Sequence, residues 1–151
     1  MRCAKFVFLL LASAIALMAA DAFVGTWKLN PAKAKYKAGA GPQQLTVTIS
    51  QSDNNLDIVE KGTGASGAPV SNHYSVPANG GIGKLIEGPY DGVSSRRLNA
   101  TQQEIGFSKS GKAVFTVRSN VSKNGKTLSN AVSGTNIAGQ AVEGVNTFEA
   151  Q

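Results

Sequence analysis

The feature that most constrains this chain is an alternation of apolar and polar residues. The segment LTVTIS, residues 45–50, puts Leu45, Val47 and Ile49 on one side and hydroxyl side chains on the other. Successive side chains of a β-strand point to opposite faces, so this pattern predicts a strand with one buried face. Its β-branched residues favour the same structure. Similar short runs recur after residue 22, and none has the spacing of an amphipathic helix. The sequence therefore predicts an all-β protein.

The same pattern predicts ten strands, separated by clusters of Gly, Asn, Asp, Ser and Pro. Most connections are too short for a crossover helix, so neighbouring strands should pair antiparallel. Asn124-Gly125 predicts a two-residue type I′ hairpin, because that turn requires positive φ at both positions. The predicted strands are residues 23–29, 43–51, 55–61, 70–76, 83–87, 93–98, 104–108, 112–121, 126–133 and 141–150.

A flat meander of ten strands would expose two edges, and closing the sheet removes them. We therefore expect one domain, residues 21–151, folded as a single antiparallel up-and-down β-barrel. Two packed sheets remain the alternative, because the stagger of the strands cannot be read from sequence. No internal repeat and no second domain are evident.

The first twenty residues predict a secretory signal peptide. Arg2 and Lys5 form a positive head, and an uncharged apolar run extends from Phe6 to Ala20. As a helix this run would reach about 22 Å, short of the roughly 30 Å hydrocarbon layer, so we expect no integral membrane span after processing. Cleavage after Ala20 is expected, or after Ala22. The mature protein should be secreted or periplasmic.

Cysteine content and charge argue against a disulfide-stabilised domain and against a nucleic-acid-binding protein. Cys3, the single cysteine, lies ahead of the apolar run, so we expect no disulfide in the mature domain and a core that stabilises it alone. Lys and Arg total 15 against 9 Asp and Glu. The lysines are scattered, and only Lys33, Lys35 and Lys37 cluster. A nucleic-acid reader would show a basic stripe with exposed aromatics, so we expect no nucleic acid partner.

The opening strand carries a resemblance to a known group of barrels. The stretch DAFVGTWKL, residues 21–29, resembles the first strand of intracellular fatty-acid-binding proteins, and Gly25-Thr26-Trp27 resembles the Gly-x-Trp signature of lipocalins. Both families are calycin barrels. The resemblance implies that Trp27 plugs the closed end of a barrel and that Gly25 lets a neighbouring backbone pass close. The whole pattern looks closest to a group of small secreted bacterial proteins of unassigned function.

The resemblance weakens along the chain. Gly111-Lys112 resembles the start of the eighth strand of fatty-acid-binding proteins, which puts Arg118 at the position of an internal arginine. In the closing strand, Asn146 and Phe148 stand where that family has the Arg-x-Tyr that holds a fatty-acid carboxylate. Residues 30–42 contain two prolines and two glycines, and a two-helix lid does not fit there.

The direction of the arginines stays open at the sequence level. The family register turns Arg118 into the lumen, whereas the competing register buries Phe115 and Val117, which favours folding by roughly 3–5 kcal/mol. An unpaired buried arginine costs several kcal/mol. Arg96 and Arg97 are adjacent, so one must point inward and the other outward.

Residues for catalysis or metal binding are sparse. His73 is the only histidine, and it should lie on the strand face opposite Tyr74 and Val76, exposed. A single imidazole with scattered carboxylates does not make a zinc site, which needs three or four converging ligands. No Gly-x-Ser-x-Gly elbow or close acidic pair occurs. We expect no enzyme activity, no metal and no cofactor.

These observations predict a monomeric binding protein for a small hydrophobic or amphipathic, fatty-acid-like ligand held in the barrel lumen. The alternative is an interaction module that grips a partner protein or envelope polymer through residues 30–42 and 62–69, with no lumenal ligand. A packed core without a ligand would use the same aromatic residues. The expected ligand-binding residues are Phe23, Trp27, Tyr74, Phe107, Arg118, Asn146 and Phe148.

Overall fold

A computed structural model describes residues 19–151, and the expected signal peptide therefore lies almost wholly outside the described residues. These described residues form twelve strands and one short 3-10 helix. In chain order these are β1 (Gly25–Leu29), η1 (Pro31–Lys33), β2 (Lys35–Ala38), β3 (Gln44–Ser52), β4 (Asn55–Thr63), β5 (Pro69–Pro77), β6 (Gly81–Ile82), β7 (Lys84–Glu87), β8 (Gly92–Asn99), β9 (Gln102–Lys109), β10 (Lys112–Val121), β11 (Thr127–Thr135) and β12 (Ala141–Ala150).

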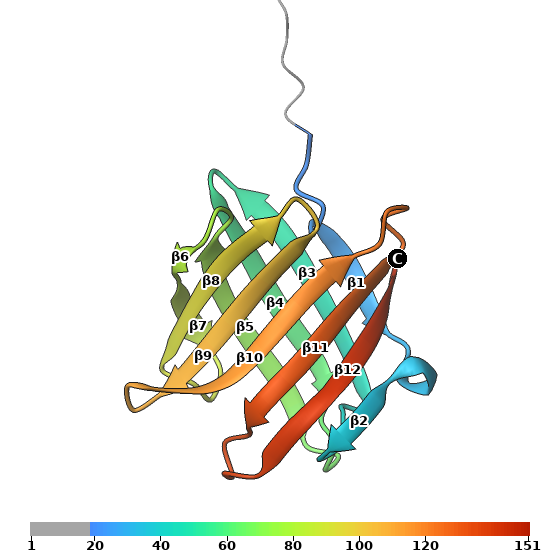
Figure 1. The fold of residues 1–151 in the computed structure, drawn as a ribbon, viewed down its shortest axis with the longest axis vertical. Coiled ribbons are helices and arrows are strands. Elements are labelled where there is room, and N and C mark those ends of the chain that lie inside the picture. Colours follow the sequence, from blue (N-terminus) through green and yellow to red (C-terminus); the bar gives the residue numbers. More distant parts are fainter. Residues whose placement is uncertain (1–18) are drawn as a thin grey trace, which may run out of the picture.

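All strands belong to one antiparallel sheet in the order β6-β8-β9-β10-β11-β12-β1-β3-β4-β5-β7, with β2 paired to β12 beside this path. In Figure 1, β8 to β12 form the wall nearest the viewer, and β1, β3, β4 and β5 cross behind them. The first strand joins the two walls, because Trp27 pairs with Ala150 of β12 and with Val47 of β3. The expected all-β antiparallel fold is confirmed.

The two ends of the sheet meet and nearly close it. The Gly83 N–H donates to the Val93 carbonyl at 2.9 Å, and the Ser95 hydroxyl donates to the Pro77 carbonyl at 2.9 Å. These contacts join the β5–β7 side to β8 although β7 and β8 form no ladder. The structure is thus a nearly closed up-and-down barrel rather than two separate sheets.

The strand count of ten was wrong, because two short strands carry no alternating apolar pattern. The sequence of β2, KYKA, contains two lysines, and β6 has only two residues. Residues 30–42 contain only η1 and β2, which confirms that no two-helix lid is present there. Strand β2 pairs with β12 beyond the point where β1 leaves it.

The hairpin prediction at Asn124-Gly125 was also wrong. Gly125 has φ +69° but Asn124 does not have positive φ, and the Gly125 N–H donates to the Ser122 carbonyl at 2.9 Å. A longer connection therefore joins β10 to β11. Positive φ at two consecutive positions occurs instead at Ser110 (51°) and Gly111 (73°), between the paired residues Lys109 and Lys112. That turn fulfils the backbone requirement of a type I′ hairpin.

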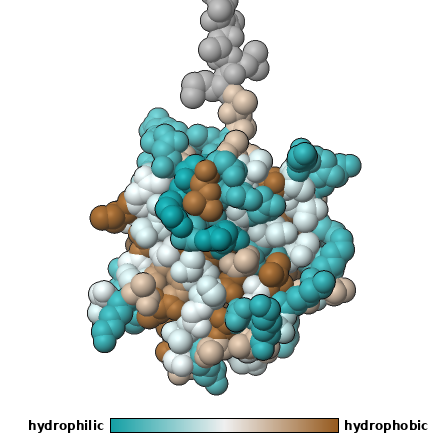
Figure 2. All heavy atoms as spheres, viewed as in Figure 1, coloured by the Kyte–Doolittle hydropathy of each residue, from teal (hydrophilic) through white to brown (hydrophobic). Residues whose placement is uncertain are grey.

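The core lies inside the barrel and is built from the alternating residues of nearly every strand. Its largest fully buried side chains are Trp27, Phe23, Phe148, Leu56, Ile58, Leu128 and Val76. The outer surface of the β8–β12 wall is mainly polar, with isolated apolar side chains (Figure 2). Within residues 19–151 there is no helix with the length and hydropathy to cross a membrane.

Candidate functional site

Trp27 is buried in the core of the barrel. Its exposed fraction is 2%, and its Nε1–H donates to the Phe23 carbonyl at 2.9 Å. Trp27 is thus buried, as a plug requires, and its role in closing the barrel stays a prediction. The expected reason for Gly25 was wrong, because a Cβ there would meet only the Trp27 ring, at 3.8 Å. Gly25 is required by its backbone, whose φ of +148° is rarely adopted by other residues.

Arg97 faces inward beside Phe23. The adjacent Arg96 points outward to Glu104, while Arg97 pairs with Asp21 and lies 5.0 Å from the centre of the Phe23 ring. The Asp21 and Arg97 side chains are 14% and 15% exposed. The inward cation of the barrel is therefore neutralised by a residue that precedes the first strand.

A row of polar side chains crosses the inner face of the β8–β12 wall. Direct cross-strand pairing joins Arg97 to Gln103, Gln103 to Ser119, Ser119 to Asn130 and Asn130 to Asn146. Gln103, Ser119 and Asn146 are buried, and the Asn130 Oδ1 has no hydrogen-bond partner among the described residues. Buried polar atoms usually have a partner, so this row is a candidate contact for a ligand or water.

The opposite wall carries the carboxylate of Glu60. Its Oε1 accepts a hydrogen bond from the Tyr74 hydroxyl at 3.1 Å, and its Oε2 accepts one from Asn72 Nδ2 at 2.9 Å. Glu60 retains intermediate exposure, yet burial raises the pKa of its carboxyl. Both observations fit a group that water can reach but that protein surrounds. The carboxylate thus faces the interior.

Aromatic rings lie beside this carboxylate. Tyr74 packs edge-on against Phe107, with ring centres 5.2 Å apart, and Tyr90 lies 4.8 Å from Phe107 and 6.4 Å from Phe115. Burial and the neighbouring Glu60 charge raise the pKa of Tyr90, and the same two causes, burial first, raise that of Tyr74 well above its usual range. Both hydroxyls therefore stay protonated and neutral.

Strand β2 adds a side chain that the sequence prediction missed. The Tyr36 hydroxyl donates to Asn146 Oδ1 at 3.0 Å, and burial raises the pKa of Tyr36. Its ring lies between two glycines, because a Cβ on Gly41 or Gly144 would approach it to 2.4 or 2.6 Å. Since KYKA lacks an apolar pattern, the only available signal was a single aromatic residue between lysines.

Some inward apolar side chains away from Trp27 are only partly buried. Val117 faces inward, paired directly with the buried Ile105 and Val132, yet it is partly exposed. Leu45 and Phe115 also pack against the core and remain partly exposed. Close packing covers the side chains of a filled core, so the interior is packed less completely around these three residues.

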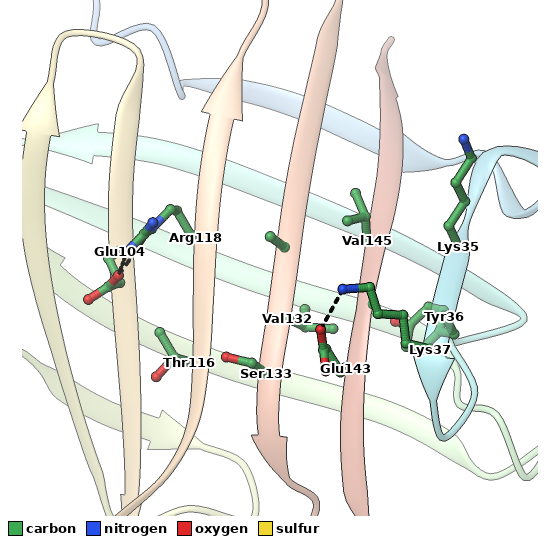
Figure 3. Close-up of a pocket in the computed structure, with 12 residues that line it drawn as sticks. Lys35, Tyr36, Lys37, Glu104, Thr116, Arg118, Val132, Ser133, Glu143 and Val145 are labelled. Atoms are coloured by element: carbon green, nitrogen blue, oxygen red, sulfur yellow. Dashed lines mark hydrogen bonds and ion pairs between the residues drawn. The ribbon is translucent and has the colours of Figure 1, made fainter.

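Two grooves lie on the outside of the barrel. The larger, about 680 Å³, runs across the outer faces of β9 to β12 and β2 (Figure 3). Arg118 and Glu104 flank one side at 2.7 Å, and Lys37 and Glu143 flank the other at 2.9 Å. The floor is made of small side chains such as Ser133. The second groove, about 360 Å³, lies over β8 and β9.

Arg118 belongs to this outer groove, so its prediction as a lumenal cation was wrong. Phe115 and Val117 face inward and Arg118 is exposed, as the burial argument favoured. The resemblance failed here because an arginine gains more from water and Glu104 than from an apolar interior. Hydrogen bonds from Arg118 and then Arg96 lower the pKa of the Glu104 carboxyl.

The other predicted site residues face inward, but they do not form one site. Phe23, Trp27 and Phe148 are almost fully buried in the core, and Tyr74 and Phe107 belong to the aromatic cluster. Asn146 ends the polar row. A role for any of them in ligand binding stays a prediction.

His73 lies outside the barrel, as expected. It is partly exposed rather than fully so, and its Nε2 lies 3.0 Å from both carboxylate oxygens of Asp57. No group of three potential metal ligands converges anywhere in the described part of the chain.

Comparisons with known proteins found similarity to solved structures alone. No protein-family model matches it, and no curated protein matches its sequence. Among solved structures, a de novo designed fluorescence-activating β-barrel is 17% identical with a TM-score of 0.46, covering 88% of this chain and 97% of that one. The redesigned barrel mFAP1 bound to DFHBI is 13% identical with a TM-score of 0.44, covering 88% and 98%. The zebrafish ileal bile acid-binding protein complexed with cholic acid is 14% identical with a TM-score of 0.44, covering 86% and 99%.

Proposed function

We propose that the protein binds a small hydrophobic or amphipathic molecule inside the barrel, without catalysis or cofactor. The single observation that supports this is the partial exposure of Val117, an inward side chain in the middle of β10. Apolar lining supplies affinity by removing area from water, and the few polar groups on the inner face orient the ligand.

A pair of neighbouring substitutions tests the location of the ligand. Val117→Phe adds bulk to the interior, whereas Thr116→Phe adds the same ring to the outer groove. A fluorescent apolar dye reports binding, and a titration with alkyl ligands displaces it. Val117→Phe should lose this binding, and Thr116→Phe should retain it. The thermal unfolding of each variant checks that the barrel is intact. Retained binding in Val117→Phe would reject a lumenal site.

The outer groove supports a second candidate, a surface that binds a partner protein or envelope polymer. Its rim includes Lys35 and Lys37, which belong to the 30–42 segment, and an arginine on the far side. Loss of partner capture from envelope extract in Thr116→Phe, with dye binding unchanged, would favour this function over the first.

We also propose that the protein is exported as a monomer and that processing occurs after Ala20. The contact between Asp21 and Arg97 supports this cleavage site, because cutting after Ala22 would remove the partner of Arg97. Amino-terminal sequencing of the exported protein should begin at Asp21. A sequence that begins at Phe23, or a protein retained in the cytoplasm, would contradict the proposal.

A further inference from the structure

The inner face of the barrel holds one carboxylate that no cation accompanies. Glu60 lies between Val47 of β3 and Asn72 of β5 in the sheet register, and its two hydrogen bonds come from Tyr74 and Asn72. Both donors are uncharged. Each carboxylate oxygen has a further lone pair, so each can accept another hydrogen bond.

The basic side chains of the described residues all lie elsewhere. Every lysine in residues 19–151 is exposed. Arg96 and Arg118 point outward and share Glu104. Arg97 points inward but is already paired with Asp21. No lysine or arginine in this part of the chain lies within ion-pair distance of Glu60.

The surroundings of Glu60 favour a positive charge. The rings of Tyr74, Tyr90, Phe107 and Phe115 form one connected cluster beside it. Aromatic faces attract cations, and ammonium groups in proteins are commonly bound between such rings. A carboxylate together with several rings therefore suits a cation, whereas an anion here would meet a like charge.

We propose that the ligand of the barrel is a cationic amphiphile, an alkylammonium whose head group binds Glu60. Its cationic head group would lie against the carboxylate of Glu60 and the faces of Tyr90 and Phe115, held by charge and cation–π attraction, and its alkyl chain would lie along Leu45 and Val117. This inference rests on the proposed lumenal function. It replaces the fatty-acid-like ligand expected from the resemblance, because the expected lumenal cation, Arg118, lies outside and the interior ionisable group without an ion-pair partner is the acid Glu60.

Three ligands of matched chain length test the preference. Calorimetric titration would compare decyltrimethylammonium, decanol and decanoate at neutral pH, each below its micelle-forming concentration. We expect the cation to bind at least about tenfold more tightly than decanoate, with decanol between them. Equal affinities, or tighter binding of decanoate, would overturn this inference and leave a lumenal binding protein. Failure of all three to bind would overturn the proposed function as well.

Two variants assign the preference to Glu60. Glu60→Gln keeps the side-chain shape and an oxygen that accepts from Tyr74, and we expect it to bind the three ligands within about threefold of one another. Glu87→Gln removes the same charge from an exposed position of β7 and should keep the preference of the unmodified protein. A preference that persists in Glu60→Gln would overturn the assignment.

A titration of the unmodified protein covers the case in which Glu60→Gln does not fold. Decyltrimethylammonium keeps its charge at every pH, so its affinity relative to decanol should fall as acid protonates Glu60. Because burial raises the pKa of this carboxyl, the fall should occur above the ordinary range of glutamate. The titratable groups that face Glu60 are Tyr74 and Tyr90, which remain neutral throughout. A relative affinity that does not change with pH would overturn the inference.

Discussion

The ring of Tyr36 lies against the backbone of Gly144, where a Cβ would stand 2.6 Å from two of its ring carbons. Such an approach is possible only for glycine. The contact attaches β2 to β12 and holds the Tyr36 hydroxyl 3.0 Å from Asn146 Oδ1. A strand with no apolar pattern of its own is thereby fixed to the barrel.

Gly144→Ala should destabilise the protein by about 1–3 kcal/mol, because the new methyl group also meets the Lys35 carbonyl at 2.7 Å. Strand β2 should exchange its amide hydrogens faster. Thermal unfolding and hydrogen exchange measure both effects. Gly106→Ala is the matched control, since a Cβ there would lie 3.6 Å from Ser94 Oγ, an ordinary contact. Unchanged exchange of β2 in Gly144→Ala would contradict this account of its attachment.

Asp21→Ala should lower the free energy of unfolding by about 2–3 kcal/mol, because it removes the ion-pair partner of the largely buried Arg97 guanidinium and leaves only the hydrogen bond from its Nε to the Ala78 carbonyl. Glu143→Ala, which removes the exposed partner of Lys37, should change it by less than about 0.5 kcal/mol. Denaturant unfolding of both variants makes the comparison. Equal losses of unfolding free energy would show that the inward Asp21–Arg97 pair stabilises the protein no more than the surface Lys37–Glu143 pair.

The stability of Glu60→Gln relative to the unmodified protein should increase as the pH rises from acid to neutral. The folded pKa of Glu60 is raised above its ordinary value of 4.5, so the stability that this carboxyl contributes is fully present below that value. It is lost as the pH rises through the folded pKa. The difference in Tm between the two proteins, measured across this range, should therefore grow with pH. A constant difference would mean that the carboxyl is not buried.

Glu104→Gln should show the opposite dependence. The pKa of Glu104 is lowered, chiefly by the hydrogen bond from Arg118, so its contribution is present above the unfolded value and disappears as acid protonates the group. Arg96 and Arg118 are well exposed, so the loss at neutral pH should not exceed about 1 kcal/mol. Denaturant unfolding at neutral and acidic pH checks the sign. If the loss of unfolding free energy in Glu104→Gln became larger in acid, the predicted sign would be wrong.

Trp27→Phe should lower the free energy of unfolding by about 2–4 kcal/mol. The smaller ring leaves a cavity in place of the indole, and the Phe23 carbonyl loses its hydrogen-bond donor. Ile82→Ala, at a side chain that is 88% exposed, should have almost no effect. Unfolding followed by far-ultraviolet circular dichroism measures both proteins, since the first lacks the tryptophan signal. A loss of unfolding free energy smaller than that of Ile82→Ala would contradict a role of Trp27 as the plug.

Much of the barrel follows from local sequence. Period-two alternation located ten of the strands to within a few residues, and residues 112–121 and 141–150 were predicted with the observed bounds. Alternation is a local property that each strand shows by itself, because one face must be buried. Burial energy also predicted the correct direction of Arg118, where the family resemblance did not.

The tertiary structure alone decided what no single segment encodes. Strand β2 exists because Gly144 of a distant strand leaves room for Tyr36, and Arg97 faces inward beside Asp21, which precedes the barrel. That Glu60 has no ion-pair partner among residues 19–151 appears only when the strands are in register and the lysines and arginines of this part of the chain have been placed. Alternation tells which residues share a face of one strand, but contacts between faces depend on stagger and closure, and these belong to the whole sheet.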